Sequence, residues 1–451
     1  MTSAMRATIR CCPPNLKSRI KAEGQLMSET ETLSRFEPFE PTWRSDPLEA
    51  FEALRDQAPV YRTASGMYVV SRYETIQALL LNPTDFSNRC VDHEALGIPR
   101  QVDAEAEPDL AEMLEATFRG IPVDRGELSK VRTVIGSDGV EHQRQRRFLN
   151  RAFSVRRVRE LRARMDELAA ECAAKVATAQ AWDAMEDLAQ VIPRRIIGEM
   201  LDVEPERHGD LTRWTNEMMA ATTGAARNSL AARQRLLNVL AEFTNYFVPK
   251  IEGKRSNPGD DFISDLVRAE GEDGLNSLET LLAIRLVMIA GTDTTSALIG
   301  NTILGLIRRP EQIQLLIDDP SLISNAIDES LRYWAPFYFL LRETTRDLEI
   351  EGVKVPEGAL VAVMLASANH DADAFADANT FDVLRTGSRG HMAFGHGAHR
   401  CVGAPLAKEE ADSALRAILP YLPLFKQADG PLELAETQLL QGFRHIGLIR
   451  K

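Results

Sequence analysis

The chain has 451 residues, of which 44% are hydrophobic and 26% charged, a balance that is ordinary for a globular protein with a sizeable core. Its formal net charge of −13 argues against general binding to nucleic acid. The five cysteines are irregularly spaced, so they predict no disulfide framework and fit a reducing cytoplasm.

The first 35 residues are polar, and we expect a disordered extension without a secretory signal, followed by one domain over residues 36–451. Extended segments are expected at Pro59–Thr63 and Met67–Arg72, and a further pair lies within Leu348–Leu365. Most of the remainder has helical periodicity, so we predict a mainly α fold with a small β region formed by segments far apart in the sequence.

Residues 91–137 are weakly patterned, which is typical of a lid or a binding loop. Directly after them, His142 and Arg146 lie one helical turn apart, so both can meet one anion. Nine arginines and a single acid, Glu160, lie between His142 and Arg164. This basic stretch predicts either a solvated face or a docking surface for an acidic partner.

A long helix is expected to begin at a capping box formed by Asn276 and Glu279 and to end before Pro310. Its apolar part would suit a bilayer by length, but the sequence Ala-Gly-Thr-Asp-Thr-Thr at its centre favours a buried helix of a protein without a membrane span. There, Asp293 and Thr294 can pass protons to a buried pocket, or they can form a packed polar turn.

Two charged features follow this helix. Glu329 and Arg332 share one helix face, and such pairs are usually surface ion pairs. Arg342 follows an apolar run, and if it is buried it needs an anion, either a carboxylate of a bound ligand or a nearby acid.

The stretch Phe394–Gly403 reads FGHGAHRCVG, and its glycines permit close approach of the backbone to a bulky group. A helix is expected to begin just after it, with Pro405 in the first turn. A sulfur at a helix start has its thiolate form favoured, which makes Cys401 a candidate metal ligand or nucleophile.

Three chemistries are compatible with Cys401. Zinc could be bound by Cys401 with the histidines at positions 391, 396 and 399, and a cysteine nucleophile could use His399 as its base. Haem with an axial cysteine uses every feature above, because its flat apolar ring suits the glycines and its propionates need cations or donors. The candidates for the propionates are His142, Arg146, Arg342 and His399.

At this point the sequence resembles the cytochrome P-450 superfamily in its soluble bacterial form. FGHGAHRCVGAPLA is similar to the haem-binding signature of that family, AGTDTT to its oxygen-activating motif, ESLR to its Glu-x-x-Arg motif, and EHQRQRR to the helix that meets a propionate. The resemblance extends from about Phe36 to the carboxyl terminus. It implies the cytochrome P-450 fold, with haem between the long central helix and the cysteine-bearing loop and helix.

The resemblance also implies roles for individual residues. Cys401 would be the axial thiolate ligand of haem b, and Thr294 with Asp293 the proton relay. Glu329 and Arg332 would hold the fold around the cysteine loop. Residues expected beside the cofactor are Phe394, Gly395, Ala290 and Gly291, and those expected to touch substrate are Phe337, Leu340 and Phe443.

The implied activity is that of a haem-thiolate monooxygenase that oxidises an apolar small molecule with O2. Its electrons would come from a ferredoxin and a ferredoxin reductase, and we expect a cytoplasmic monomer. The alternatives are a peroxide-driven enzyme and a haem-based binding or sensing protein. The sequence departs from the usual pattern in the acidic 91–137 region, in His370 where arginine is frequent, and in Gln441-Gly442-Phe443.

Overall fold

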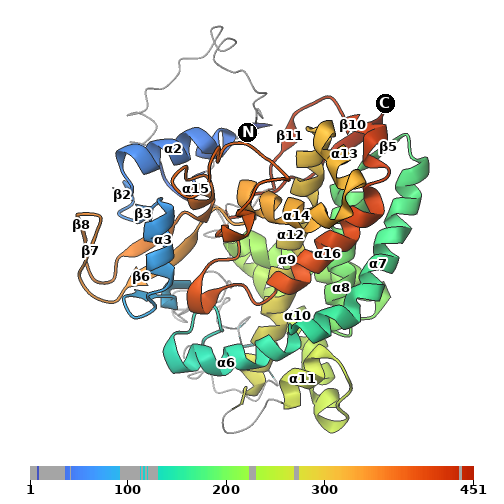
Figure 1. Ribbon diagram of the computed structural model, residues 1–451. Coiled ribbons are helices and arrows are strands. Elements are labelled where there is room, and N and C mark those ends of the chain that lie inside the picture. Colours follow the sequence, from blue (N-terminus) through green and yellow to red (C-terminus); the bar gives the residue numbers. More distant parts are fainter. Residues whose placement is uncertain are drawn as a thin grey trace.

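Helices form most of the computed structural model shown in Figure 1. The structure describes residues 8–9, 36–40, 42–91, 131–222, 230–268, 274–435 and 439–451, with a few single residues between 112 and 119. Apart from Thr8–Ile9, which form a short strand, the expected disordered extension lies outside these residues, as does most of the 91–137 region, so those two predictions stay predictions.

The central helix is α12 (Ser277–Ile307), which is buried over most of its length and packs against α8 (Val191–Met200), α14 (Ile323–Tyr333) and α16 (Ala404–Ile418) (Figure 1). The capping box predicted at its start is present, since the Asn276 side chain accepts from the Glu279 N–H and the Glu279 side chain accepts from the Asn276 N–H. By length and composition α12 could cross a membrane, but the fold buries most of it as a core helix.

Further helices that contact α12 are α9 (His208–Thr222), α10 (Leu230–Ser256), α11 (Phe262–Arg268) and α13 (Pro310–Asp318). Helices α6 (Gly139–Ala152) and α7 (Val155–Thr178) carry the arginine-rich stretch, and α7 packs along α16. The remaining helices are α2 (Pro47–Gln57), α3 (Tyr73–Leu80) and α15 (Leu365–Asn369).

A five-stranded sheet has the order β2-β3-β9-β6-β4, so it joins segments nearly 300 residues apart, as predicted. Strand β3 runs parallel to β9 with Val69 opposite Ala362, whereas the other pairs are antiparallel. The strands are β2 (Val60–Arg62), β3 (Tyr68–Val70), β4 (Phe86–Ser87), β6 (Leu340–Thr344) and β9 (Leu360–Val363).

Smaller sheets complete the described part of the chain. Strand β12 lies between β10 and β5, β7 forms a hairpin with β8, and β1 pairs with β11. Their bounds are β1 (Thr8–Ile9), β5 (Ala181–Asp183), β7 (Leu348–Ile350), β8 (Val353–Val355), β10 (Phe425–Gln427), β11 (Leu432–Glu433) and β12 (Gly447–Arg450).

Candidate functional site

The segment before α16 forms a tight loop that presents Cys401. The Cys401 N–H donates to the Phe394 carbonyl at 2.8 Å, which closes the loop. Gly395 and Gly397 have φ angles of +67° and +70°, a region that side chains rarely adopt. A Cβ atom at Gly397 would lie only 2.4 Å from the Leu80 carbonyl oxygen, so glycine lets this loop contact the end of α3.

The Cys401 side chain is exposed, although it lies where the loop meets α16. Burial by the surrounding protein raises the pKa of its thiol, and the backbone N–H groups of Gly403 and Ala404 and the charge of Arg146 oppose that rise. Because the Cys401 sulfur is exposed although many protein atoms surround it, we infer that it faces a space inside the protein. A cation at this sulfur would favour the thiolate, as metal coordination does.

The residues predicted to contact the haem propionates lie on three segments of the fold. The rings of His142 in α6 and His399 in the loop are 3.9 Å apart, and Arg146 donates to the Arg400 carbonyl beside them. Burial lowers the pKa of both imidazoles, that of His399 to about 3. The His142 Nε2 atom is buried without a hydrogen-bond partner.

Arg342 in β6 is only 4% exposed, and burial lowers its pKa to about 10. Its guanidinium donates to the Leu341 carbonyl at 2.7 Å, and the described residues offer it no ion pair with a carboxylate. A buried cation without an acid, beside an unpartnered imidazole nitrogen, fits the propionates of haem. The residues present therefore fit the cofactor that the sequence predicts.

Helix α12 presents Ala290 and Thr294 on one face. Ala290 is exposed although Met288 and Thr292 in the same helix are buried, and the Thr294 hydroxyl donates to the Ala290 carbonyl at 2.7 Å. Asp293 is partly buried, which raises its pKa, and the charge of Arg194 in α8 opposes that rise. The sequence reasoning missed Arg194, because nothing in either segment signals that α8 faces this turn.

Gly291 does not face the same way. A Cβ atom there would lie 2.5 Å from Cδ1 of Ile197, so the missing side chain lets α8 pack against α12. Whether its backbone also lines the oxygen site stays a prediction.

The Glu329 and Arg332 side chains form a fully buried ion pair at 2.8 Å, not a surface pair. Arg332 also donates to the carbonyls of Asn369 and Ala378, and Arg385 forms a second ion pair with Glu329 at 3.1 Å. Arg385 was missed because its pairing spans 56 residues. This cluster ties α14 to the chain that leads into the cysteine loop.

The histidines of the zinc alternative are not gathered. The Nε2 atom of His391 is 3.4 Å from Asp328, which also accepts from Lys408, whereas His399 contacts His142. Among the described residues, no group of three or more His, Cys, Asp and Glu side chains could hold a metal ion. A zinc centre therefore has no support.

The predicted substrate contacts lie on two segments that meet. Phe337 is bridged to Leu440, and Phe443 to Leu434, while Leu340 begins β6 two residues before Arg342. Phe443 is buried, and Phe337 and Leu340 are partly buried. Their contact with a substrate stays a prediction.

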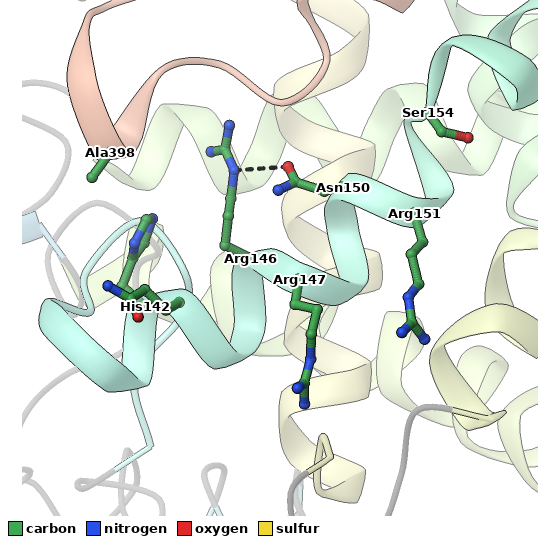
Figure 2. A pocket seen from close by; sticks show the side chains of 8 residues that line it. His142, Arg146, Arg147, Asn150, Arg151, Ser154 and Ala398 are labelled. Atoms are coloured by element: carbon green, nitrogen blue, oxygen red, sulfur yellow. Dashed lines mark hydrogen bonds between the residues drawn. The ribbon is translucent and has the colours of Figure 1, made fainter.

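The arginine-rich stretch is divided by the fold. Arg144, Arg157, Arg162 and Arg164 form ion pairs with acids of the protein itself. An open depression of about 590 Å³ lies along α6 and is lined by His142, Gln143, Arg146, Arg147, Asn150, Arg151, Ser154 and Ala398. Figure 2 shows His142 and Arg146 pointing toward the segment of Ala398, and Arg147 and Arg151 pointing away from it.

Comparisons with known proteins agree with this arrangement. A family model described as Cytochrome P450 matches residues 115–443. Cytochrome P450 107B1 of Saccharopolyspora erythraea is 32% identical over 88% of this chain and 92% of its own. Vitamin D(3) 25-hydroxylase of Pseudonocardia autotrophica is 31% identical over 90% of this chain and 94% of its own.

Solved structures give the same result. The structure of cytochrome P450 CYP109Q5 from Chondromyces apiculatus superposes with a TM-score of 0.77 and 28% identity, over 93% of this chain and 99% of that one. On the matched residues, the two relatives and this fold, the chain belongs to the cytochrome P450 family of haem-thiolate monooxygenases.

Proposed function

We propose that the protein oxidises an apolar small molecule with O2, using two electrons from a ferredoxin and its reductase. Each turnover consumes one O2, two electrons and two protons, inserts one oxygen atom into substrate and releases the other as water. The observation that carries this proposal is the exposed Cys401 sulfur just before α16, together with a buried Arg342 that makes no ion pair with a carboxylate in the described part of the chain.

Haem b would be held by Cys401 as axial thiolate, with Arg342, His142, His399 and Arg146 near its propionates. When bound, it supplies the iron that binds and activates O2. Phe394 lies in the loop that closes on Cys401, and its carbonyl fixes that residue by accepting from its N–H. An imidazole N–H of His142 or His399 can donate a hydrogen bond to a propionate oxygen.

Thr294 and Asp293 would move protons on the α12 face. The Thr294 hydroxyl donates to the Ala290 carbonyl in this structure, and it can turn to donate toward the O2 site. Asp293 can then restore a proton at Thr294 Oγ1, because its buried carboxyl holds a proton more readily than a solvated one. A peroxide-driven enzyme or a sensor would not need this pair, which favours the O2-dependent reaction.

We infer an apolar substrate, since the predicted contacts Phe337, Leu340 and Phe443 are all apolar and one relative is a vitamin D(3) hydroxylase by name. The acidic ferredoxin would dock on the exposed side of α6, where Arg151 makes no ion pair within the described residues. We further propose a monomer that acts in the cytoplasm and binds no nucleic acid, in line with the net charge of −13.

The decisive experiment is the absorption spectrum of the reduced protein under carbon monoxide. Thiolate ligation by Cys401 predicts a strongly red-shifted Soret band, and Cys401→Ser should abolish it. Product formation from O2 with a surrogate electron donor then separates the monooxygenase from a sensor. An unchanged spectrum in Cys401→Ser would refute the assignment of the ligand.

A further inference from the structure

Side chains of helix α6 make contacts on two of its sides. His142 and Arg146 point toward the loop of Cys401, as described above. Between them, Arg144 and Gln145 turn toward the first turn of α12 and donate hydrogen bonds to Glu279. Helix α6 thus carries residues that point toward the Cys401 loop and residues that hydrogen-bond to the first turn of α12.

Glu279 takes part both in the N-terminal cap of α12 and in the contact between α12 and α6. Its Oε2 atom accepts from the Asn276 N–H at 2.8 Å and from Arg144 at 3.3 Å, and its Oε1 atom accepts from Gln145 at 3.3 Å. The carboxylate is only 6% exposed, and Arg144 also donates to the Gly274 carbonyl just before the cap. A buried carboxylate with this many donors fixes the position of its helix end.

The junction leaves almost no free space. A cavity of about 10 Å³, too small for more than one water molecule, is enclosed by residues of α6, of α12 and of the segment before α6. Gln145 also donates to the Arg132 carbonyl of that segment at 2.8 Å. A shift of α6 along α12 would therefore break several contacts at once.

Among the residues that the structure describes, the charged side chains shown in contact with Glu279 are Arg144 and Glu141 of α6. Arg144 donates to Glu141 at 3.1 Å and 2.5 Å, and these bonds hold the pKa of Glu141 below its usual range. Without the arginine, two carboxylates would stand next to each other with no cation between them.

Resting on the proposed function, we propose that Arg144 is a positioning residue: through Glu279 it holds α6, and with it His142 and Arg146, in register with the helix that carries Asp293 and Thr294. Nothing in the sequence marks Arg144 among the nine arginines of its stretch. Its partner lies 135 residues further on.

The test measures the rate at which the purified holoprotein loses haem to excess apomyoglobin. Arg144→Met should lose haem about tenfold faster, since hydrogen bonds to a charged group are removed. Arg144→Lys, which keeps the charge without the planar fork, should lie between Arg144→Met and the unaltered protein.

Two control variants separate positioning from general destabilisation. Glu141→Gln keeps the Arg144–Glu279 contact and should retain haem normally. Arg164→Met breaks a comparable ion pair, with Glu199, that joins α7 to α8 away from the junction. Equal haem loss in Arg144→Met and Arg164→Met would overturn the proposal.

Hydrogen exchange judges the junction independently of haem. In the Arg144→Met protein before haem is added, amides of residues 139–152 and 277–285 should exchange faster together, and in Arg164→Met they should not. If neither the unaltered protein nor any variant binds haem, the proposed function is wrong. Hydrogen exchange then decides by itself whether Arg144 joins α6 to α12. Faster exchange confined to α6 would refute the junction.

Discussion

Thr294 and Asp293 are adjacent in sequence but have different surroundings. The Thr294 hydroxyl is engaged with its own helix, whereas the Asp293 carboxyl is partly buried near the charge of Arg194. Sequence alone could identify the pair from its residue types in an apolar helix. It could not supply Arg194, because the approach of α8 is a property of packing.

Thr294→Ala should separate electron consumption from product formation. Removing the hydroxyl removes the last proton carrier of the relay, and proton transfer by a positioned group is worth about 10²-fold or more. The measurement is product formed per electron pair, together with released peroxide. Thr294→Ser, which keeps a hydroxyl, should stay close to the unaltered protein, and equal coupling in the alanine variant would remove Thr294 from the relay.

At the scale of elements, α14 is held by a buried charge cluster. Glu329 pairs with Arg332 and Arg385 and accepts from the Ser388 hydroxyl at 3.0 Å. The spacing of Glu329 and Arg332 indicated a shared face, but it could not reveal burial, because the covering residues come from sequence positions 369–388.

Glu329→Gln should lower the free energy of unfolding by about 3–5 kcal/mol, since two arginines remain buried without their carboxylate. Urea unfolding followed by circular dichroism measures this change. The pKa of Glu329 is lowered by the arginines, so its stabilising contribution is present above the ordinary carboxyl pKa and is lost as the pH falls through the native value. A loss below about 1 kcal/mol, as expected for exposed pairs, would contradict the cluster.

Helix α16 carries a second buried carboxyl. Glu410 is fully buried, neither oxygen has a hydrogen-bond partner among the described residues, and burial raises its pKa well above the usual value. No sequence pattern separates it from its neighbour Glu409, which pairs with Arg162 near the surface.

Glu410→Gln should flatten the dependence of unfolding free energy on pH. The native carboxyl keeps its proton while the unfolded one releases it, so stability falls by about 1.4 kcal/mol per pH unit above the unfolded pKa. The Glu410→Gln variant should lack this pH dependence over the pH range in which the native Glu410 carboxyl stays protonated. Unfolding free energies at several pH values measure it, and Glu409→Gln is the control that should keep the slope.

At the scale of the whole molecule, the fold places arginines that look alike in the sequence in different surroundings. Some arginines of the basic stretch are neutralised internally, while Arg151 stays exposed beside the depression along α6. The order of the main sheet was equally hidden. Strands β2, β3 and β9 were recognisable by composition, whereas β4 and β6 were not predicted, and the parallel pairing of β3 with β9 has no local signal.

Arg151→Glu should weaken docking of an acidic ferredoxin. The KM for ferredoxin should rise about tenfold at low ionic strength, and the difference should shrink as salt screens the contact. Steady-state electron transfer at several salt concentrations measures this effect. Arg159→Glu, an equal charge change on α7 outside the depression, should leave the KM nearly unaltered, and equal effects of both variants would argue against a defined dock.

The close approach of Gly397 to the Leu80 carbonyl has an evolutionary consequence. The contact is made by main-chain atoms on the α3 side, so it does not depend on which side chain stands at position 80. Any side chain at position 397 would clash, and no change of residue 80 could compensate. Natural variants of this protein should therefore keep glycine at position 397, whichever residue ends α3.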